Sequence, residues 1–340
     1  MKKKKITVPL FLLFFCSRFL FAFDNGFFIG AEPVYSLQNG ILQEYVIAYD
    51  KVSNQNVTMS RLDWQLENIS YLGGRINTGW KFISLSAEYS KAFSKTSGIM
   101  EDYDWLDYIE NTFYYYRNPL LCTTKSISEN TLNDANNFEI VLKFDINPFF
   151  DLVISPFAGF NYSTYSFSGR NAYGWYGNAS ALTNWKTYSY DSPEAYFYDA
   201  GTLGGIDYKR DTSDFFIGAS IGCIFFDRVS FGASVSVSPY FNVQSLDFHH
   251  ISYEDTTTGK YYYDIMTSYF NKYNFGAYAE CVIVKGLSID VSFNYSVQDN
   301  TPGVTYFNYK PKFNKTDKSE TTSNSTGRFW VLKGGIKYTF

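Results

Sequence analysis

The sequence predicts an all-β protein, namely a ten-stranded antiparallel transmembrane β-barrel with long extracellular loops. Three observations support this prediction. The 340 residues include 33 Phe, 31 Tyr and 6 Trp, whereas only 18% of the residues are charged. Apolar and polar residues alternate with period two over many stretches. The connections between these stretches are short and long in turn, as is typical of barrels that cross an outer membrane.

The composition excludes several other classes of protein. The chain is too apolar and aromatic for a disordered protein. After its N-terminal segment it has no run of ~18 uncharged apolar residues that could form a spanning helix. Four Cys are too few for a disulfide framework in a chain of this length. Two His leave little room for a zinc site, so neither a metal ion nor a cofactor is expected.

Residues 1–22 have the pattern of a signal peptide. Lys2 to Lys5 form a basic start, Val8 to Phe15 form a short apolar core, and Leu20 to Ala22 provide a cleavage site. Export would leave residues 23–340 as a single barrel domain. The removed segment holds five of the 29 Lys and Arg and none of the 33 acids, so the mature chain has a charge of −9. Nucleic acid is therefore not an expected partner.

Each alternating stretch has one apolar and aromatic face and one face of small or ionisable side chains. The clearest examples are residues 83–90, 138–146 and 287–297. A soluble β-sandwich also alternates, but this pairing of faces suits lipid outside and a polar lumen inside. A closed barrel also pairs every backbone N–H and C=O group in a solvent that cannot do so.

The connections indicate how many strands there are and which end is extracellular. Four short turns and five long polar loops join ten strands. The turns are expected at residues 77–81, 147–151, 227–228 and 285–286, and the loops at 49–57, 97–132, 171–197, 249–260 and 301–326. Several strands are nearer 20 residues than the ~10 needed to span a bilayer, so we expect the wall to project beyond the membrane. The final stretch, Ile336 to Phe340, resembles the assembly signal of bacterial outer-membrane proteins.

Two segments on different loops carry candidate catalytic residues. Asp102 and Asp104 face the same way in an extended chain, as do Asp247 and His249. A carboxylate beside an imidazole orients the ring and stabilises its protonated form. Two neighbouring carboxylates tend to share a proton. Together these groups could deprotonate a water molecule, but the spacing alone does not distinguish such a site from solvated loops.

The sequence resembles the omptin family of outer-membrane endoproteases, which use a ten-stranded barrel with an extracellular active site. The resemblance covers nearly the whole mature chain. The matching motifs are Gly98-x-Met100-x-Asp102-x-Asp104-Trp105, Asp247-x-His249, Arg61-Leu62-Asp63-Trp64, Leu132-Asn133-x-Ala135-Asn136-x-Phe138-Glu139, Tyr165-Ser166-Phe167 and Gly335 to Phe340.

This resemblance implies the roles of the four residues and identifies 23–340 as an outer-membrane β-barrel protease domain. A water molecule would lie between His249 and Asp102. His249 would act as the general base, Asp247 would orient it, and Asp104 would position or tune Asp102. The expected substrates are peptides or host proteins, and the other expected partner is the outer-membrane lipid.

The resemblance also implies a preference for basic residues before the scissile bond, held by two acidic side chains. One of them matches Glu44, for which an exposed strand charge is an equally good interpretation. The other should stand at position 245, where this chain has Ser245. Met100 and, less closely, Ile206 match the apolar contacts on the other side of the bond.

The family's lipid site is not retained. The resemblance implies a lipopolysaccharide activator, bound through an aromatic residue, a carboxylate and an arginine on the fifth strand. The matching positions are Phe160, Tyr162 and Thr164, so the carboxylate and the arginine are missing and the need for a glycolipid stays open. Two other functions also stay open, a catalytically inactive surface adhesin and a small passive pore.

Residue parity makes one further prediction. From Val229 to Val243 the apolar residues have odd numbers, as do Asp247 and His249, so unbroken alternation would turn the catalytic pair toward lipid. We therefore expect a β-bulge between Pro239 and Leu246. The tyrosine-rich stretch Tyr261 to Tyr263 is interpreted as barrel wall.

Overall fold

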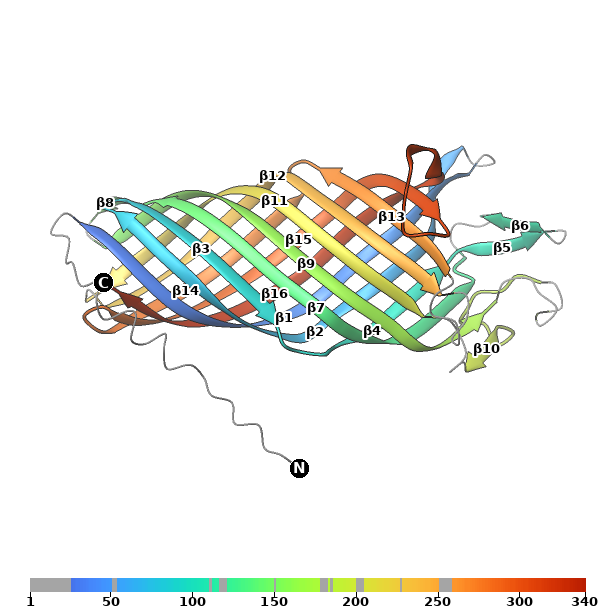
Figure 1. The fold of residues 1–340 in the computed structure, drawn as a ribbon, viewed down its shortest axis with the longest axis horizontal. Coiled ribbons are helices and arrows are strands. Elements are labelled where there is room, and N and C mark those ends of the chain that lie inside the picture. The colour runs from blue at the N-terminus through green and yellow to red at the C-terminus, as the bar shows by residue number, and fades with distance from the viewer. Residues whose placement is uncertain are drawn as a thin grey trace, which may run out of the picture.

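The chain forms a closed antiparallel ring of long strands (Figure 1). The computed structural model describes residues 26–340 except 51–53, 110–111, 116–120, 150, 178–182, 184–185, 200–204, 227 and 251–258. The predicted signal peptide lies outside the described residues. The first strand pairs with the last from Gly30–Thr339 to Ile47–Thr322, and this pairing closes the ring.

The ring has ten wall positions, which confirms the predicted strand number. They are β1 (Phe27–Asp50), β2 (Gln55–Trp80), β3 with β4 (Ile83–Ala92 and Thr96–Asp104), β7 (Thr124–Phe144), β9 (Leu152–Tyr176), β11 (Ile206–Phe225), β12 (Val229–His250), β13 with β14 (Gly259–Ser268 and Lys272–Val284), β15 (Leu287–Asn308) and β16 (Lys318–Thr339). The short elements are β5 (Leu106–Ile109), β6 (Thr112–Tyr115), β8 (Ile146–Phe149), β10 (Tyr196–Asp199) and the 3₁₀ helix η3 (Lys315–Asp317).

No helix among the described residues is long and apolar enough to cross a bilayer.

The two ends of the barrel differ, as the sequence predicts. The turn end carries the four short connections, and the loop end carries the long ones with β5, β6 and β10 (Figure 1). The unbroken wall strands have 20 to 26 residues. Since ~10 residues span a bilayer, about half of the wall extends beyond a membrane.

The outer surface near the turn end is apolar. Large side chains there that are 42–62% exposed include Leu72, Ile76, Leu85, Ile217, Ile221, Phe231, Val235, Phe275, Val291 and Ile336. Cys223 and Cys281 are free thiols on the same outward parity. An apolar belt of this kind is stable only against lipid.

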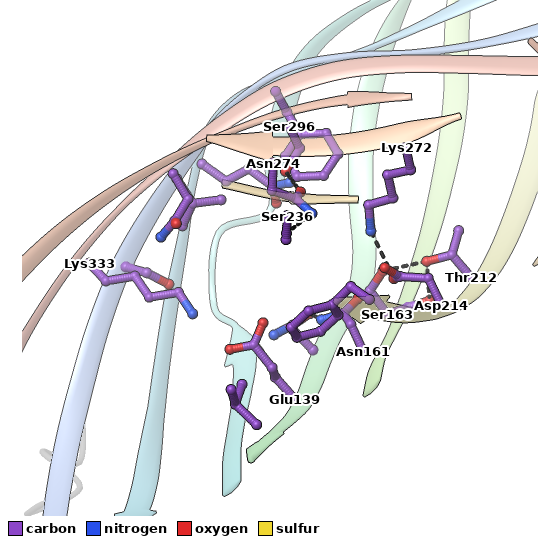
Figure 2. A pocket seen from close by; sticks show the side chains of 18 of the residues that line it. Glu139, Asn161, Ser163, Thr212, Asp214, Ser236, Lys272, Asn274, Ser296 and Lys333 are labelled. Atoms are coloured by element: carbon purple, nitrogen blue, oxygen red, sulfur yellow. Dashed lines mark hydrogen bonds and ion pairs between the residues drawn. The ribbon is translucent and has the colours of Figure 1, made fainter. Parts of the chain in front are cut away.

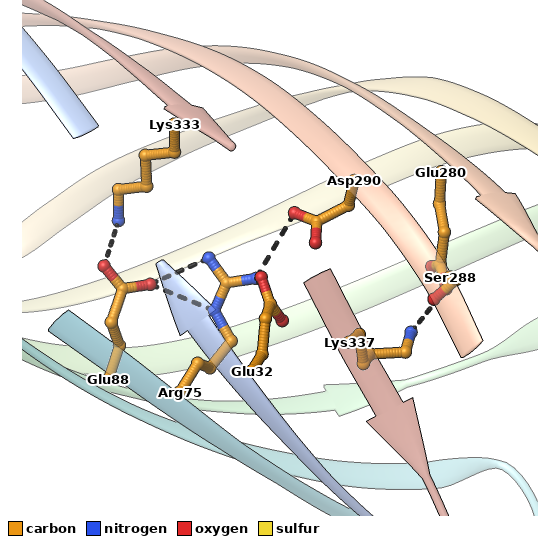
Figure 3. A network of polar contacts seen from close by, with 8 residues as sticks. All are labelled: Glu32, Arg75, Glu88, Glu280, Ser288, Asp290, Lys333 and Lys337. Carbon is orange, nitrogen blue, oxygen red and sulfur yellow. Dashed lines mark hydrogen bonds and ion pairs between the residues drawn. The ribbon is translucent and has the colours of Figure 1, made fainter. Parts of the chain in front are cut away.

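The interior of the turn end holds a charge network (Figure 3). Arg75 donates to Glu88 at 2.8 Å and to Glu32 at 3.1 Å, and Lys333 donates to Glu88 at 2.8 Å. Lys337 pairs with Glu280 at 2.6 Å. Acidic and basic groups from different strands therefore neutralise each other across the lumen.

Above this network lies a polar cavity of about 360 Å³ (Figure 2). Its walls include Glu139, Lys333 and Asp214, and Lys272 donates to Asp214 at 2.8 Å.

Further toward the loop end a hydrophobic plug crosses the lumen. The plug consists of Leu42, Leu62, Trp64, Leu66, Ile69, Tyr71, Met100, Leu132, Ala135, Tyr165, Phe167, Ile206 and Tyr208. Trp64 from β2 stacks on Tyr208 from β11, with ring centroids 4.8 Å apart, so the plug joins distant walls and forms the floor of the loop end.

Candidate active site

A β-bulge in β12 turns the predicted catalytic pair into the barrel. Phe215 pairs with Tyr240 and Ile217 with Val237, so Ser238 and Pro239 together face the single residue Phe216. Before the bulge the buried residues have even numbers, and after it Phe241, Val243, Ser245 and Asp247 are buried. The predicted bulge is confirmed, and it lies at the N-terminal edge of the expected range.

Asp102 and Asp104 lie on β4 and share the inward parity of Met100, which belongs to the plug. Asp102 pairs with Leu62 on β2, and Ser60 Oγ donates to its Oδ1 at 3.3 Å. Burial and the charge of Asp104 raise the pKa of Asp102 well above its ordinary value. Burial raises the pKa of Asp104 to about 6. Two such carboxyl groups tend to share a proton, and burial and the neighbouring charge favour the protonated form of Asp102.

Asp247 and His249 lie on β12, where they pair with Tyr208 and Ile206 of β11. The His249 ring meets the Tyr262 ring edge-on, with centroids 5.1 Å apart. Burial, and then the charges of Lys260 and His250, lower the pKa of His249 to about 4. His249 is therefore a neutral imidazole at neutral pH and can accept a proton.

The structure brings the two halves of the site to the same interior but does not join all their side chains. Asp247 is buried, and burial, then the charges of Glu44, Asp264 and Asp102, raise its pKa well above the ordinary value. Oδ1 of Asp247 has no hydrogen-bond partner among the described residues. His249 makes no hydrogen bond to Asp247 or Asp102 in the described part of the chain, so its orientation by Asp247 stays a prediction.

Glu44 is not an exposed strand charge, because it is only 3% exposed on the inner face of β1. It lies beside Asp247 and a third carboxylate, Asp264 of β13, which the sequence analysis did not identify. One oxygen from each of the three lies within 4.8 Å of the others. We call these residues the acid cluster. They are the one set of described side chains with the composition and spacing of metal ligands.

Asp264 was not predicted as a site residue because it directly follows the tyrosine-rich stretch that was interpreted as barrel wall. The available signal was that Asp264 is the only charged residue in 261–268 and shares its parity with Met266, which is fully buried. Two further neighbours of the site were also missed. Ser60 contacts Asp102, and the charges of Asp102 and Asp104 help burial to raise the pKa of Tyr176 to about 12.

Met100 and Ile206, the predicted apolar contacts, lie together in the plug. They are 2% and 6% exposed. Gly169 pairs with Ile206 across β9 and β11, and a Cβ at this glycine would lie 3.0 Å from Cε of Met100. A side chain at Gly169 would therefore press on Met100.

His250, next to the predicted base, lies on the opposite face of β12. Its Nε2 is 2.8 Å from Asp207, which also pairs with Arg170 at 2.5 Å. Phe160, Tyr162 and Thr164 likewise have the outward parity of β9. These positions belong to the outer wall and not to the interior site.

The barrel, the plug and the inward acids match a known protein family. A model of the omptin family fits residues 36–340. The chain belongs to the omptin family. The fold also resembles the crystal structure of the outer-membrane protease OmpT from Escherichia coli, with a TM-score of 0.71, 20% sequence identity and coverage of 92% of this chain and 97% of OmpT. At this identity OmpT supports the fold alone.

Other outer-membrane barrels resemble this omptin much less closely. The attachment invasion locus protein Ail of Yersinia pestis has a TM-score of 0.29 and 8% identity, with 92% of this chain and 99% of Ail covered. No curated protein matches the sequence. The family assignment confirms the predicted outer-membrane location and places the chain in a family of outer-membrane proteases.

Proposed function

We propose that this omptin is an endopeptidase of the cell surface that hydrolyses peptide bonds next to basic residues. The main support is that Asp102, Asp104, Asp247 and His249, from two separate strands, share the interior above the plug. The family assignment supports peptides as the substrate class. The acid cluster, which includes Glu44, supports the basic preference.

The protonation states suit attack by a water molecule on a carbonyl carbon. Neutral His249 takes a proton from the water as its oxygen bonds to the carbon. Asp102, whose raised pKa favours its protonated form, donates a hydrogen bond to the carbonyl oxygen as negative charge develops there. His249 then passes its proton to the leaving amine. No covalent intermediate forms, and Asp247 stabilises the imidazolium once Asp247 is ionised.

The test compares two adjacent histidines in the refolded mature chain, with and without lipopolysaccharide, on a quenched peptide that contains arginine. His249→Ala should lower kcat/KM by about 10²–10⁴. His250→Ala removes a side chain of the outer face that acts on His249 only through its charge, and should stay within about threefold of the wild type. Equal activity of wild type and His249→Ala would refute the mechanism. No cleavage by the wild type with any lipid would favour the inactive adhesin.

A further inference from the structure

The acid cluster gathers three carboxyl groups for which the described part of the fold supplies no cation. Glu44, Asp247 and Asp264 are 3%, 5% and 4% exposed. Within the described chain none of them forms an ion pair with Lys, Arg or His at 4.0 Å or less. Buried carboxylates without a cation are unstable in a protein interior. The cluster therefore has the electrostatics of a receptor for a positive charge that comes from another molecule.

Hydrogen bonds fix the position of Asp264 at the wall. Ser245 pairs with Asp264 across β12 and β13. Ser245 Oγ lies 2.8 Å from Glu44 Oε1 and 3.4 Å from Asp264 Oδ2, and its single proton bridges the two carboxylates. Thr305 Oγ1 donates to the other oxygen of Asp264 at 2.6 Å. Asp264 is thus held with one oxygen toward Glu44.

Several polar atoms at the cluster have no hydrogen-bond partner among the described residues. Glu44 Oε2 and Asp247 Oδ1 are buried with no hydrogen-bond partner among the described residues, and the same holds for the hydroxyl of Tyr208. Tyr208 is 2% exposed and pairs with Asp247 across β11 and β12. The charges of Glu44 and Asp247 add to burial in raising its pKa. Polar atoms buried in this way are normally satisfied, which points to a ligand with several N–H donors.

Arg210 does not neutralise the acid cluster, because its terminal nitrogens are hydrogen-bonded elsewhere. Arg210 also acts on Tyr208, but its Nη1 donates to Ser325 and its Nη2 donates to Gln298, both at 2.7 Å. Arg210 also lines the polar cavity. A guanidinium carries five N–H donors and an ammonium three, spread over directions that separate carboxylates can accept.

We propose that Asp264, together with Glu44, binds the Arg or Lys side chain of the peptide substrate, with Ser245 bridging the two carboxylates. This inference rests on the proposed function and names the second acidic residue of its basic-residue site. The carboxylate that the family resemblance places at position 245 is here supplied from the paired position on the neighbouring strand. In this arrangement Ser245 supports the binding site for the basic side chain, and its presence does not mean that the site has been lost.

The first test uses two quenched peptides that differ only in Arg or its uncharged analogue citrulline before the scissile bond. Asp264→Asn should lower kcat/KM on the Arg peptide by about 10- to 100-fold, as expected for a lost charge-assisted hydrogen bond. Cleavage of the citrulline peptide should change little. Asp134→Asn, an exposed acid paired with Lys91 on the outer wall, is the matched control. An unchanged Arg-to-citrulline ratio in Asp264→Asn would overturn the proposal.

A swap separates recognition from folding. The double variant Ser245→Asp with Asp264→Ser moves the carboxylate across the strand pair and keeps the net charge. It should regain most of the Arg preference that Asp264→Ser alone loses. A folded double variant with no preference would count against recognition by Asp264.

A binding measurement distinguishes failure of this inference from failure of the proposed function. Calorimetry with a peptide whose scissile amide is reduced should show tighter binding of the Arg form than of the citrulline form, and Asp264→Asn should remove the difference. If the wild type cleaves nothing but binds in this way, the protease assignment fails and the inference holds. If Ca²⁺ or Mg²⁺ binds at the cluster and the Arg preference ignores Asp264, the cluster is a metal site and the inference fails.

Discussion

The two halves of the barrel interior treat buried charge in opposite ways. At the turn end Glu88 is held by Arg75 and Lys333, and Glu280 by Lys337 (Figure 3). At the loop end five carboxylates face the interior without an ion pair among the described residues. They are Glu44, Asp102, Asp104, Asp247 and Asp264.

This contrast separates structural from functional charge. Breaking a buried ion pair is costly because the remaining charge has no partner, so the turn end gains a rigid, filled lumen. The loop end keeps its acids uncompensated, which costs stability but leaves them available to a ligand. The hydrophobic plug crosses the lumen between the two.

The largest expected effect is a loss of activity, and it is tested by comparing two single-residue deletions in β12. Deleting Leu246 would turn Asp247 and His249 to the outer face, because one residue reverses the parity of a strand. Deleting Pro239 would only replace the bulge with regular alternation and leave both residues inward. We expect kcat/KM to fall by at least about 10³ for the first deletion and by less than about tenfold for the second. Equal loss of activity in two folded barrels would show that strand parity does not place the pair.

The next effect is on stability at the turn end. Glu88→Gln leaves Arg75 and Lys333 without their shared carboxylate. The free energy of unfolding should fall by about 3–5 kcal/mol, measured by urea titration of the barrel in lipid vesicles. Lys91→Gln, which breaks an exposed outer pair, should cost less than about 1 kcal/mol. A similar cost for both variants would remove the distinction between the network and a surface pair.

At the loop end the sign of the stability effect should reverse. Glu44→Gln replaces one of three clustered carboxyl groups by an uncharged amide and keeps an acceptor for Ser245. We expect the barrel to gain about 0.5–2 kcal/mol while its cleavage of Arg peptides weakens. The same urea titration provides the measurement. A loss of stability would mean that Glu44 is a structural charge.

The smallest effect is on pH dependence. The ionised Asp104 helps to raise the pKa of Asp102, so Asp104→Asn should lower that pKa. If protonated Asp102 is required, the high-pH fall in kcat/KM moves to lower pH.

Since the pKa of Asp104 is about 6 in the folded protein, against 3.8 ordinarily, the folded state binds its proton more tightly. Stability should therefore fall as pH rises between these values, and Asp104→Asn should make this fall smaller. A profile that does not move would remove the link between the two acids.

Much of the fold could be predicted from the sequence because alternation and loop length are local properties. They gave the ten wall positions, the two ends and the bulge in β12. Other parity changes were not foreseen. Glu67 and Asn68 together face Asn39, and Asp299 and Asn300 together face Thr326. No proline marks these positions, so the sequence offered no comparable signal.

The candidate site shows the same limit. Residues two apart on one strand could be grouped from the sequence, as with Asp102 and Asp104. Asp264 could not be grouped with Ser245, because their proximity depends on the pairing register of β12 and β13. The resemblance to a family identifies positions that match, and a group that has moved to a neighbouring strand falls outside such a match.

Asp247 belongs to both the acid cluster and the catalytic pair. Its neighbours Glu44 and Asp264 oppose its ionisation in the empty barrel. A positive side chain between them would relieve that repulsion and let Asp247 lose its proton, which in turn makes His249 more basic. A substrate with a positive side chain would thereby make His249 a stronger base for its own hydrolysis. An uncharged peptide would leave Asp247 protonated and His249 a weaker base.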